Sequence, residues 1–562
     1  MRTAPPRVRT AAVAATTLLL LAACATGPKD RAGGESPASD PEALLADADA
    51  ALERNELPEA ARAYRRAAEA SQDEAVAEQA AEVAFEHSQY GETLLAAGRW
   101  LALNPTSEQA RRHAGVAALQ LHRLDEAEAQ FATLLETGYI SPAAGFLALL
   151  PVLTGHGTAP DLTELFRRLV ARHPDVAEGH YALAAAALRS ENFGLALASA
   201  RRATEIAPYW VPARMMLART MIASGDEDAG LEMARDLVLA PEAEVAVQLE
   251  YALLLAGIGR DEEARAILTP FASGTRVFPG AVRALGVLDL QRGDLDAAAA
   301  RFEDLLSTGA QSYDALYFLG AVADRREDSE RALRYYSRVT GGDFALQAQG
   351  RVARLKARQS GLDAGLAHLD EFARGHPQRG PDVVAARAGL ASSLDDPGRA
   401  LAILDAGLVQ YPDSMDLRMA RVFAYERMGK VDAAIRDLRR LLADRPGDAV
   451  VQNALGYTLA DRNRQLDEAA ALVSAALVQM PDSSAVLDSM GWVAFRQGRL
   501  QEAVKYLERA RDLGEDVEID LHLGEVQWAL GDKTAARKTW QEALERRPDD
   551  ARLKQRLEQA GP

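Results

Sequence analysis

Side chains that commonly carry catalysis occur in this chain of 562 residues, but not at the spacings that catalysis or metal binding requires. The nine histidines form no HExxH motif, and His113 and His122 stand nine residues apart, so we predict no zinc site. The acidic run 226–228 is similar to the start of a calcium loop, but Leu237 stands where the bidentate glutamate would be. Neither GxSxG nor SxxK occurs. We therefore expect no enzyme activity, no metal ion and no cofactor.

Cys24 is the only cysteine, and it follows a segment with the features of an export signal. The segment contains a largely apolar run over residues 11–21, which is shorter than the roughly 20 residues that span a bilayer. Three basic residues precede this run: Arg2, Arg7 and Arg9. The run ends in Leu21-Ala22-Ala23-Cys24. This sequence resembles the lipobox of bacterial lipoproteins, in which the cysteine is lipidated and becomes the mature N-terminus.

The lipobox resemblance implies lipid attachment at Cys24 and removal of residues 1–23. Lipidation would also account for a lone cysteine, because an unpaired thiol is a liability in an oxidising compartment. Ala25 follows the cysteine, where in the family an aspartate favours retention at the inner membrane. The resemblance therefore implies a lipid-anchored, periplasm-facing protein of the outer membrane. The alternative is a plain secretory signal whose cleavage site happens to contain a cysteine.

Three imperfect copies of one helical pattern occupy residues 449–549. The last copy has Leu523-Gly524 followed by an alanine, a large residue, a second alanine and a closing proline: Ala536, Trp540, Ala543 and Pro548. The matching residues of the other two copies are Gly491, Ala503, Leu507 and Ala510, and Gly456, Ala469, Val473, Ala476 and Pro481. This is the tetratricopeptide pattern, with a period of about 34 residues. Small residues let the two helices of a repeat approach closely, and we expect Trp540 to be buried in the groove between them.

The same register continues from residue 41 to the C-terminus and accommodates about fifteen repeats at this period. The closing prolines Pro377, Pro412, Pro446 and Pro481 lie 35, 34 and 35 residues apart. Between residues 143 and 174 the pattern degrades, and we expect one divergent repeat there. A helix pair alone cannot bury its apolar face, so the repeats must stack. The sequence therefore predicts an all-α fold, an elongated tetratricopeptide-repeat α-solenoid in the form of a right-handed superhelix of helix hairpins.

The charge and the register together suggest the organisation of the chain. The formal net charge is −18 and no basic stripe occurs, so we do not expect nucleic-acid binding. Residues 25–40 are rich in Gly, Pro, Ser and charge, which is typical of a flexible tether. The expected segments are a lipoprotein signal peptide (1–23), the lipidated cysteine and tether (24–40), N-terminal repeats ending in the divergent one (41–176), central repeats (177–448), C-terminal repeats (449–550), and a capping helix and tail (551–562).

The first helices of the C-terminal repeats carry large aromatic residues beside polar ones on the expected concave, wet face. Such a surface is typical of partner recognition. The candidate partner-binding residues are Asn453, Tyr457, Asp488, Trp492, Phe495, Leu521 and Trp528. An alternative of equal weight is that Tyr457 and Trp492 pack against the next repeat and stabilise the stack. The pattern differs from the Lys/Asn-rich clamp with which some chaperone cofactors hold C-terminal carboxylates, because these two aromatic residues occupy a clamp position.

An N-terminal lipobox, a short tether and an array containing NALGYTLADR and LDSMGWVAFRQGRLQEAVKYLERA resemble outer-membrane lipoprotein adaptors of proteobacteria. Those adaptors bind and activate a periplasmic carboxyl-terminal processing protease and deliver peptidoglycan hydrolases to it. The sequence motifs that are specific to this resemblance lie within residues 453–510 only. The resemblance implies a scaffold for a periplasmic protein partner. A second hypothesis is an assembly factor for outer-membrane proteins or polysaccharide export, and a third is an enzyme with His156 or His173 in the divergent segment.

Overall fold

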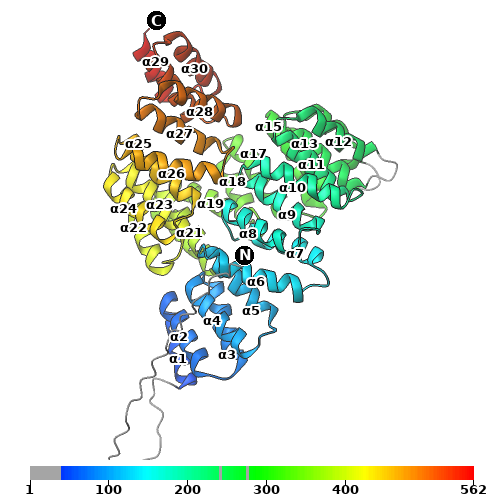
Figure 1. Cartoon of the computed structure of the whole chain (residues 1–562), viewed down its shortest axis with the longest axis vertical. Coiled ribbons are helices and arrows are strands. Elements are labelled where there is room, and N and C mark those ends of the chain that lie inside the picture. The colour runs from blue at the N-terminus through cyan, green and yellow to red at the C-terminus, as the bar shows by residue number, and fades with distance from the viewer. Residues whose placement is uncertain (1–39, 240–243, 274–276, 562) are drawn as a thin grey trace, which may run out of the picture.

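The computed structural model describes residues 40–239, 244–273 and 277–561, and over these ranges the chain contains α-helices and no strand (Figure 1). The first ten helices are α1 (Pro41–Glu53), α2 (Leu57–Ala70), α3 (Glu74–Glu86), α4 (Tyr90–Leu103), α5 (Glu108–Gln120), α6 (Leu124–Thr137), α7 (Pro142–Thr154), α8 (Ala159–Arg172), α9 (Ala177–Arg189) and α10 (Phe193–Ile206). The next ten are α11 (Val211–Ala223), α12 (Glu227–Leu239), α13 (Val245–Gly257), α14 (Asp261–Ala272), α15 (Pro279–Arg292), α16 (Leu295–Ser307), α17 (Ser312–Arg325), α18 (Ser329–Tyr336), α19 (Ala345–Ser360) and α20 (Leu362–Arg374).

The remaining helices follow a short 3₁₀ segment, η2 (Pro377–Arg379). They are α21 (Gly380–Ser393), α22 (Pro397–Gln410), α23 (Met415–Arg427), α24 (Val431–Asp444), α25 (Ala449–Asp461), α26 (Leu466–Gln479), α27 (Ser484–Arg496), α28 (Leu500–Leu513), α29 (Val517–Ala529), α30 (Lys533–Arg546) and α31 (Ala551–Ala560). Among the described helices α1 to α30, fourteen consecutive pairs pack as hairpins, with α7 and α8 as the exception, and α31 packs against α30. The predicted all-α solenoid is confirmed. Within the described ranges no helix has the length and apolarity needed to cross a membrane.

The small residues of the repeat pattern are needed because a large side chain of the second helix lies directly against them. A Cβ atom added at Gly524 of α29 would lie 2.1 Å from the indole nitrogen of Trp540 on α30. Trp540 itself is buried, as expected, and its Nε1–H donates to the carbonyl of Leu521 at 3.4 Å. The Leu-Gly pair and the large residue sixteen positions later thus bring the two helices of a repeat into contact.

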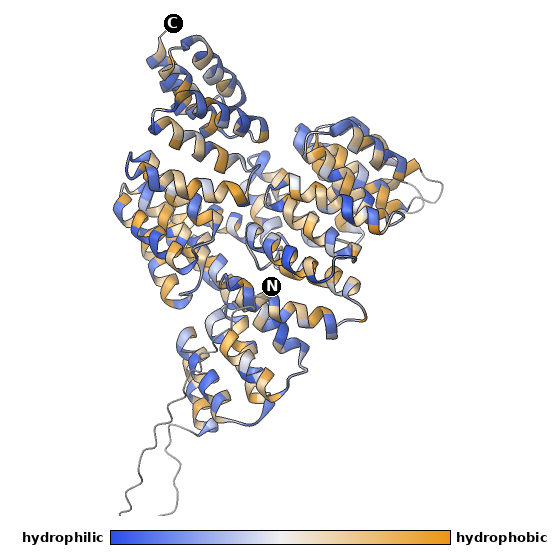
Figure 2. Cartoon of the chain, in the orientation of Figure 1, coloured by the Kyte–Doolittle hydropathy of each residue, from blue (hydrophilic) through white to orange (hydrophobic). Residues whose placement is uncertain are grey.

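The apolar core follows the chain instead of forming one centre. Buried residues cluster within and between neighbouring hairpins, for example over residues 116–186, 345–424 and 422–493. Figure 2 shows hydrophobic residues distributed along all hairpins, interleaved with polar ones. Each repeat is therefore stabilised mainly by its sequence neighbours, which is the expected behaviour of a solenoid.

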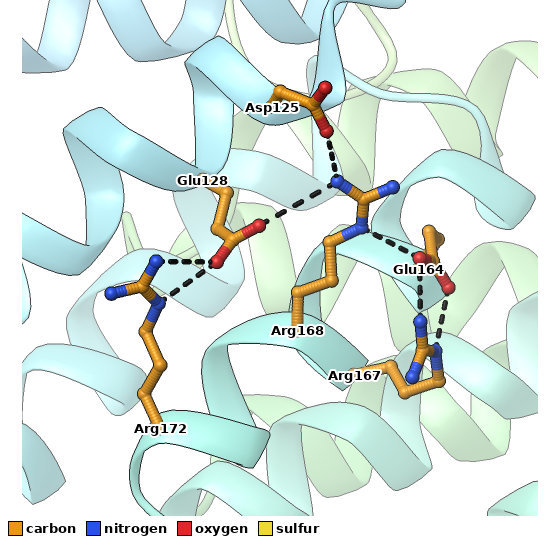
Figure 3. Close-up of polar contacts among 6 residues, drawn as sticks. All are labelled: Asp125, Glu128, Glu164, Arg167, Arg168 and Arg172. Carbon is orange, nitrogen blue, oxygen red and sulfur yellow. Dashed lines mark hydrogen bonds and ion pairs between the residues drawn. The ribbon is translucent and has the colours of Figure 1, made fainter. Parts of the chain in front are cut away.

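The divergent repeat consists of α7 and α8, and it departs from the usual pairing. Helix α7 packs mainly on α9 and makes little contact with α8, whereas α8 packs on α6 and α9. An ion-pair network joins α6 to α8 (Figure 3). In it, Arg168 contacts Asp125 at 2.5 Å and Glu164 at 2.7 Å, and Arg172 contacts Glu128 at 2.8 Å. The second helices α6 and α8 thus remain in contact with each other, although α7, the first helix of the divergent repeat, packs on α9 instead of α8.

The solenoid is not the open, elongated stack that the sequence suggested, because it curls until distant repeats touch. The turn before α4 meets the end of α22, and the end of α5 meets the residue that follows α24. Gln89 Nε2 donates to the carbonyl of Gln410 at 2.8 Å, and the Gly91 amide donates to Asp413 Oδ2 at 3.2 Å. Further along, Arg445 donates to the carbonyl of Gln120. The accumulated rotation between repeats returns the chain to its own N-terminal part after more than 300 residues.

Candidate protein-binding surface in the C-terminal repeats

Three successive first helices, α25, α27 and α29, carry all seven residues predicted to bind a partner. The starts of α25 and α29 are fixed by side-chain N-caps, which satisfy free N–H groups of the first turn. Asp448 accepts from the Val450 and Val451 amides at the start of α25, and Asp516 accepts from the Glu518 amide at the start of α29. Side chains one repeat apart therefore stand next to one another on neighbouring helices.

A buried aspartate–histidine pair lies at the centre of this surface. His522 Nδ1 lies 2.8 Å from Asp488 Oδ1, and the imidazole stacks on the indole of Trp492 with ring centroids 4.1 Å apart. The side chains of Asp488, Trp492 and His522 are all buried. The expectation that Asp488 lies on a wet face is wrong, and for Trp492 the alternative of packing against the next repeat holds, because His522 of the following repeat packs over both.

Tyr457 and Phe495 are half-buried and lie at the edge of this centre. The hydroxyl of Tyr457 donates to Glu518 Oε1 at 3.0 Å, and the Phe495 ring lies 5.0 Å from Trp492. Asn453 is also half-buried, and its Oδ1 is buried without a hydrogen-bond partner among the described residues. The structure thus brings Tyr457, Asp488, Trp492 and Phe495 into one cluster.

Leu521 and Trp528 belong to a different group, around Trp540 and α31. Leu521 is buried, so the expected exposure of this residue is also wrong. Trp528 is half-buried, with its ring 6.0 Å from Trp540 and 5.0 Å from the ammonium of Lys533. The predicted surface therefore has two aromatic parts, one centred on Trp492 and one on Trp528.

Several carboxylates that the sequence prediction did not include surround the first aromatic part. Burial raises the pKa of Glu426, and the charges of Asp461 and Glu518 raise it further. Burial and the hydrogen bond and charge of Glu518 raise the pKa of the Tyr457 hydroxyl. This acidic environment disfavours an acidic partner segment and favours a basic or neutral one.

The histidine of the central pair has an unusual protonation equilibrium. Burial alone would lower the pKa of His522, but the hydrogen bond and charge of Asp488, with Glu518 and Glu525 nearby, outweigh burial and raise it. His522 and Glu518 are the main residues that the sequence prediction missed. The signal was available, because His522 lies 34 residues after Asp488, close to one repeat period.

The arrangement offers contact surface for a protein partner. Over the described residues, no group of three or more His, Cys, Asp or Glu side chains could hold a metal ion. His156, the candidate of the enzyme hypothesis, lies 5.9 Å from the ring of Phe85, and burial lowers its pKa. His173 lies edge-on to Phe146. Cys24, the expected lipid attachment site, lies outside the described residues.

Comparison with known proteins agrees with this architecture. A tetratricopeptide-repeat family model matches residues 164–209, 283–345, 419–484 and 489–551. The chain thus matches tetratricopeptide repeats over these four segments, and its described helices form an all-α solenoid. A tetratricopeptide-repeat-containing protein of Pseudomonas aeruginosa is 36% identical to this solenoid over 213 residues. That match covers 38% of this chain and 36% of the relative, so it spans little more than a third of the relative's length.

Solved structures of helical-repeat proteins are also similar to this solenoid. A tetratricopeptide-repeat protein from Parabacteroides merdae shares 16% identity, with a TM-score of 0.35, over 45% of this chain and all of that chain. Yeast Tom70 shares 12% identity, with a TM-score of 0.33, over 92% of this chain and 94% of its own.

Proposed function

We propose that this protein is a lipid-anchored periplasmic scaffold that binds a partner enzyme and presents protein substrates to it. The partner that best fits the sequence resemblance is a carboxyl-terminal processing protease, with peptidoglycan hydrolases as clients. Tetratricopeptide repeats act as protein-interaction scaffolds, which supports the general part of the proposal. An anchor at Cys24 would confine the partner to the membrane surface and raise its effective concentration there.

The observation that carries the proposal is the aromatic surface of α25, α27 and α29. The buried Asp488–His522 pair and Trp492 form a rigid base, and the half-buried rings of Tyr457, Phe495 and Trp528 remain open to contact. Rigid aromatic side chains on a preorganised base contribute most of the binding energy in many protein interfaces. The carboxylates around Tyr457 favour a partner segment without acidic residues.

The test is recovery of the partner from crosslinked, detergent-solubilised envelopes by mass spectrometry. The informative variant is Phe495→Ala with Trp528→Ala, since both rings are only half-buried and their loss spares the central pair. We expect this variant to weaken partner binding by about 2–4 kcal/mol. The matched control is Tyr209→Ala, which removes an aromatic ring that is 94% exposed and distant in sequence from this surface.

The outcomes separate the hypotheses. Capture of a processing protease that depends on Phe495 and Trp528 supports the proposal. Capture of components of outer-membrane protein assembly or polysaccharide export would instead favour the assembly-factor hypothesis. Equal recovery of the same partner with both variants would show that the aromatic surface is not the binding site.

A further inference from the structure

The contact between the two ends of the curl has a regular construction. We call it the seam and define it by residues 55–57, 88–91, 120–123 and 191–193 on one side and 410–413, 445–448 and 482 on the other. On the first side these residues lie in the turns within hairpins, between α1 and α2, α3 and α4, α5 and α6, and α9 and α10. On the second side they lie in the turns between hairpins, from α22 to α27. One edge of the solenoid thus meets its opposite edge.

The same hydrogen-bond chemistry recurs along the seam. An aspartate that follows a closing proline accepts from an amide at the start of a second helix. The Gly91 amide donates to Asp413 at 3.2 Å, and the Phe193 amide donates to Asp482 at 3.1 Å. The Asp482 amide in turn donates to the carbonyl of Glu191 at 3.2 Å. Free N–H groups at helix starts favour a carboxylate partner, so each contact is favourable on its own.

The seam is polar and incompletely filled. Among the described residues, no apolar core cluster contains members from both sides of it. A cavity of about 900 Å³ lies between the α1–α2 turn and α20 to α22, with Leu57 on one side and Val384 on the other. A second cavity of about 300 Å³ lies between His156 and Asp382. Opening the seam would therefore break hydrogen bonds without exposing a packed core, unlike separation of neighbouring repeats.

The turns at the seam place residues with side chains, instead of glycine, at a positive φ. Most turns within hairpins place at least one residue at a positive φ, and seven of the later turns use glycine there: Gly225, Gly259, Gly293, Gly361, Gly429, Gly498 and Gly531. The four turns at the seam use residues with side chains, namely Asn55, Ser88, His122 and Glu191. Glu327, Asp395 and Asn463 do so away from the seam. Such residues cost about 1 kcal/mol or more each, and Ser88 is buried against the seam.

The seam holds the helices that carry the candidate binding surface. Asp448, buried in the seam, is the N-cap of α25, and Asp482 directly precedes the N-cap of α27. Helix α29 begins beyond the last seam contact. Helices α25 and α27 thus lie next to seam residues and also carry residues of the candidate surface.

We propose that the seam is a reversible clasp, whose opening converts the closed curl into an open superhelix and admits a polypeptide to its inner surface. Opening and closing are properties of the chain alone. Coupling of the clasp to partner binding rests on the proposed function, because both would act on α25 and α27.

The test is a distance measurement by electron paramagnetic resonance on the full chain with Cys24→Ser. Spin labels are placed at Arg123→Cys and Gly447→Cys, on opposite sides of the seam. A Cβ atom at Gly447 lies 3.8 Å from His122, so cysteine fits there. We expect a short and a long distance to coexist. Asp413→Ala with Asp482→Ala should increase the long population about fivefold for each hydrogen bond removed.

Two controls accompany this measurement. Labels at Arg123→Cys and Glu136→Cys, both at α6, should give one distance in every variant. Asp549→Ala removes the aspartate of the equivalent turn before α31, outside the seam, and should change nothing. A single distance across the seam that does not respond to Asp413→Ala with Asp482→Ala would overturn the proposal.

Hydrogen exchange provides a second readout without substitutions at the seam. The Gly91 and Phe193 amides should exchange more slowly than the equivalent amide of Glu227 in α12, outside the seam. They should exchange faster than amides in the middle of α4 and α10. Exchange as slow as that of helix interiors would mean that the seam opens only with global unfolding, which would also overturn the proposal.

Discussion

Replacing Gly524 by alanine tests the principle on which every repeat depends, that the first helix must leave room for one large side chain of the second. A methyl group at Gly524 would lie 2.1 Å from Nε1 and 2.4 Å from Cε2 of Trp540, which are buried and cannot retreat into solvent. Overpacking of this kind costs about 1–3 kcal/mol. Displacing the indole also weakens its hydrogen bond to Leu521, about 1 kcal/mol. Alanine regains about 1 kcal/mol in a helix, so the net loss is about 1–3 kcal/mol.

The assay is urea unfolding followed by tryptophan fluorescence, with amide exchange of α29 to α31 as a local readout. The matched control is Gly389→Ala in α21, where an added Cβ would meet nothing within 4 Å, so it should stabilise the protein by about 0.5–1 kcal/mol. Trp540→Leu should cost less in the Gly524→Ala background than in the wild type, because it removes the clash. Equal effects of the two glycine substitutions would refute the steric argument.

The remaining predictions concern pH. The raised pKa of His522 means that its pair with Asp488 contributes stability that is fully present below about pH 6.5 and is lost as pH rises through the raised value. His522→Gln should therefore lower the melting temperature more at about pH 6 than at about pH 9, and the reverse order would contradict the pairing. Burial lowers the pKa of His113 to about 4, so stability falls as pH drops from about 6.5 towards 4, by at most about 3 kcal/mol. His113→Phe should reduce the fall of the melting temperature between about pH 6.5 and pH 4. An unchanged fall would mean that other groups cause the acid sensitivity.

The hairpins could be predicted because their determinants are local. Gly524 and Trp540 stand sixteen residues apart and meet across one turn, so spacing alone identifies the contact. The seam could not be predicted this way. Its contacts join residues such as Gly91 and Asp413, and they depend on small rotations accumulated over many repeats. The divergent α7–α8 repeat lies within this stretch, and the sequence marked its divergence but not how its helices would pack.

The candidate surface was predicted in part. The helix positions of Tyr457 and Phe495 followed from the repeat register, and both lie where contact with a partner remains open. Packing of Trp492 against the following repeat was one of two alternatives of equal weight, and the register alone could not decide between them because it assigned each repeat its own face. His522 reaches back one repeat to Asp488 and covers the indole. Pairs of polar residues about one period apart are the sequence signal that would have corrected this.

Contacts that join residues 191–193 to residue 482 also constrain the order of events during synthesis. Each hairpin can stack as soon as it emerges, since its partners are adjacent in sequence. The turns before α4, α6 and α10 must instead wait until about 290 to 320 further residues have been made, with their helix starts uncovered throughout. A nascent chain halted before the end of α22 would consequently exist as an open spiral, accessible to chaperones and proteases along an edge that the mature protein covers.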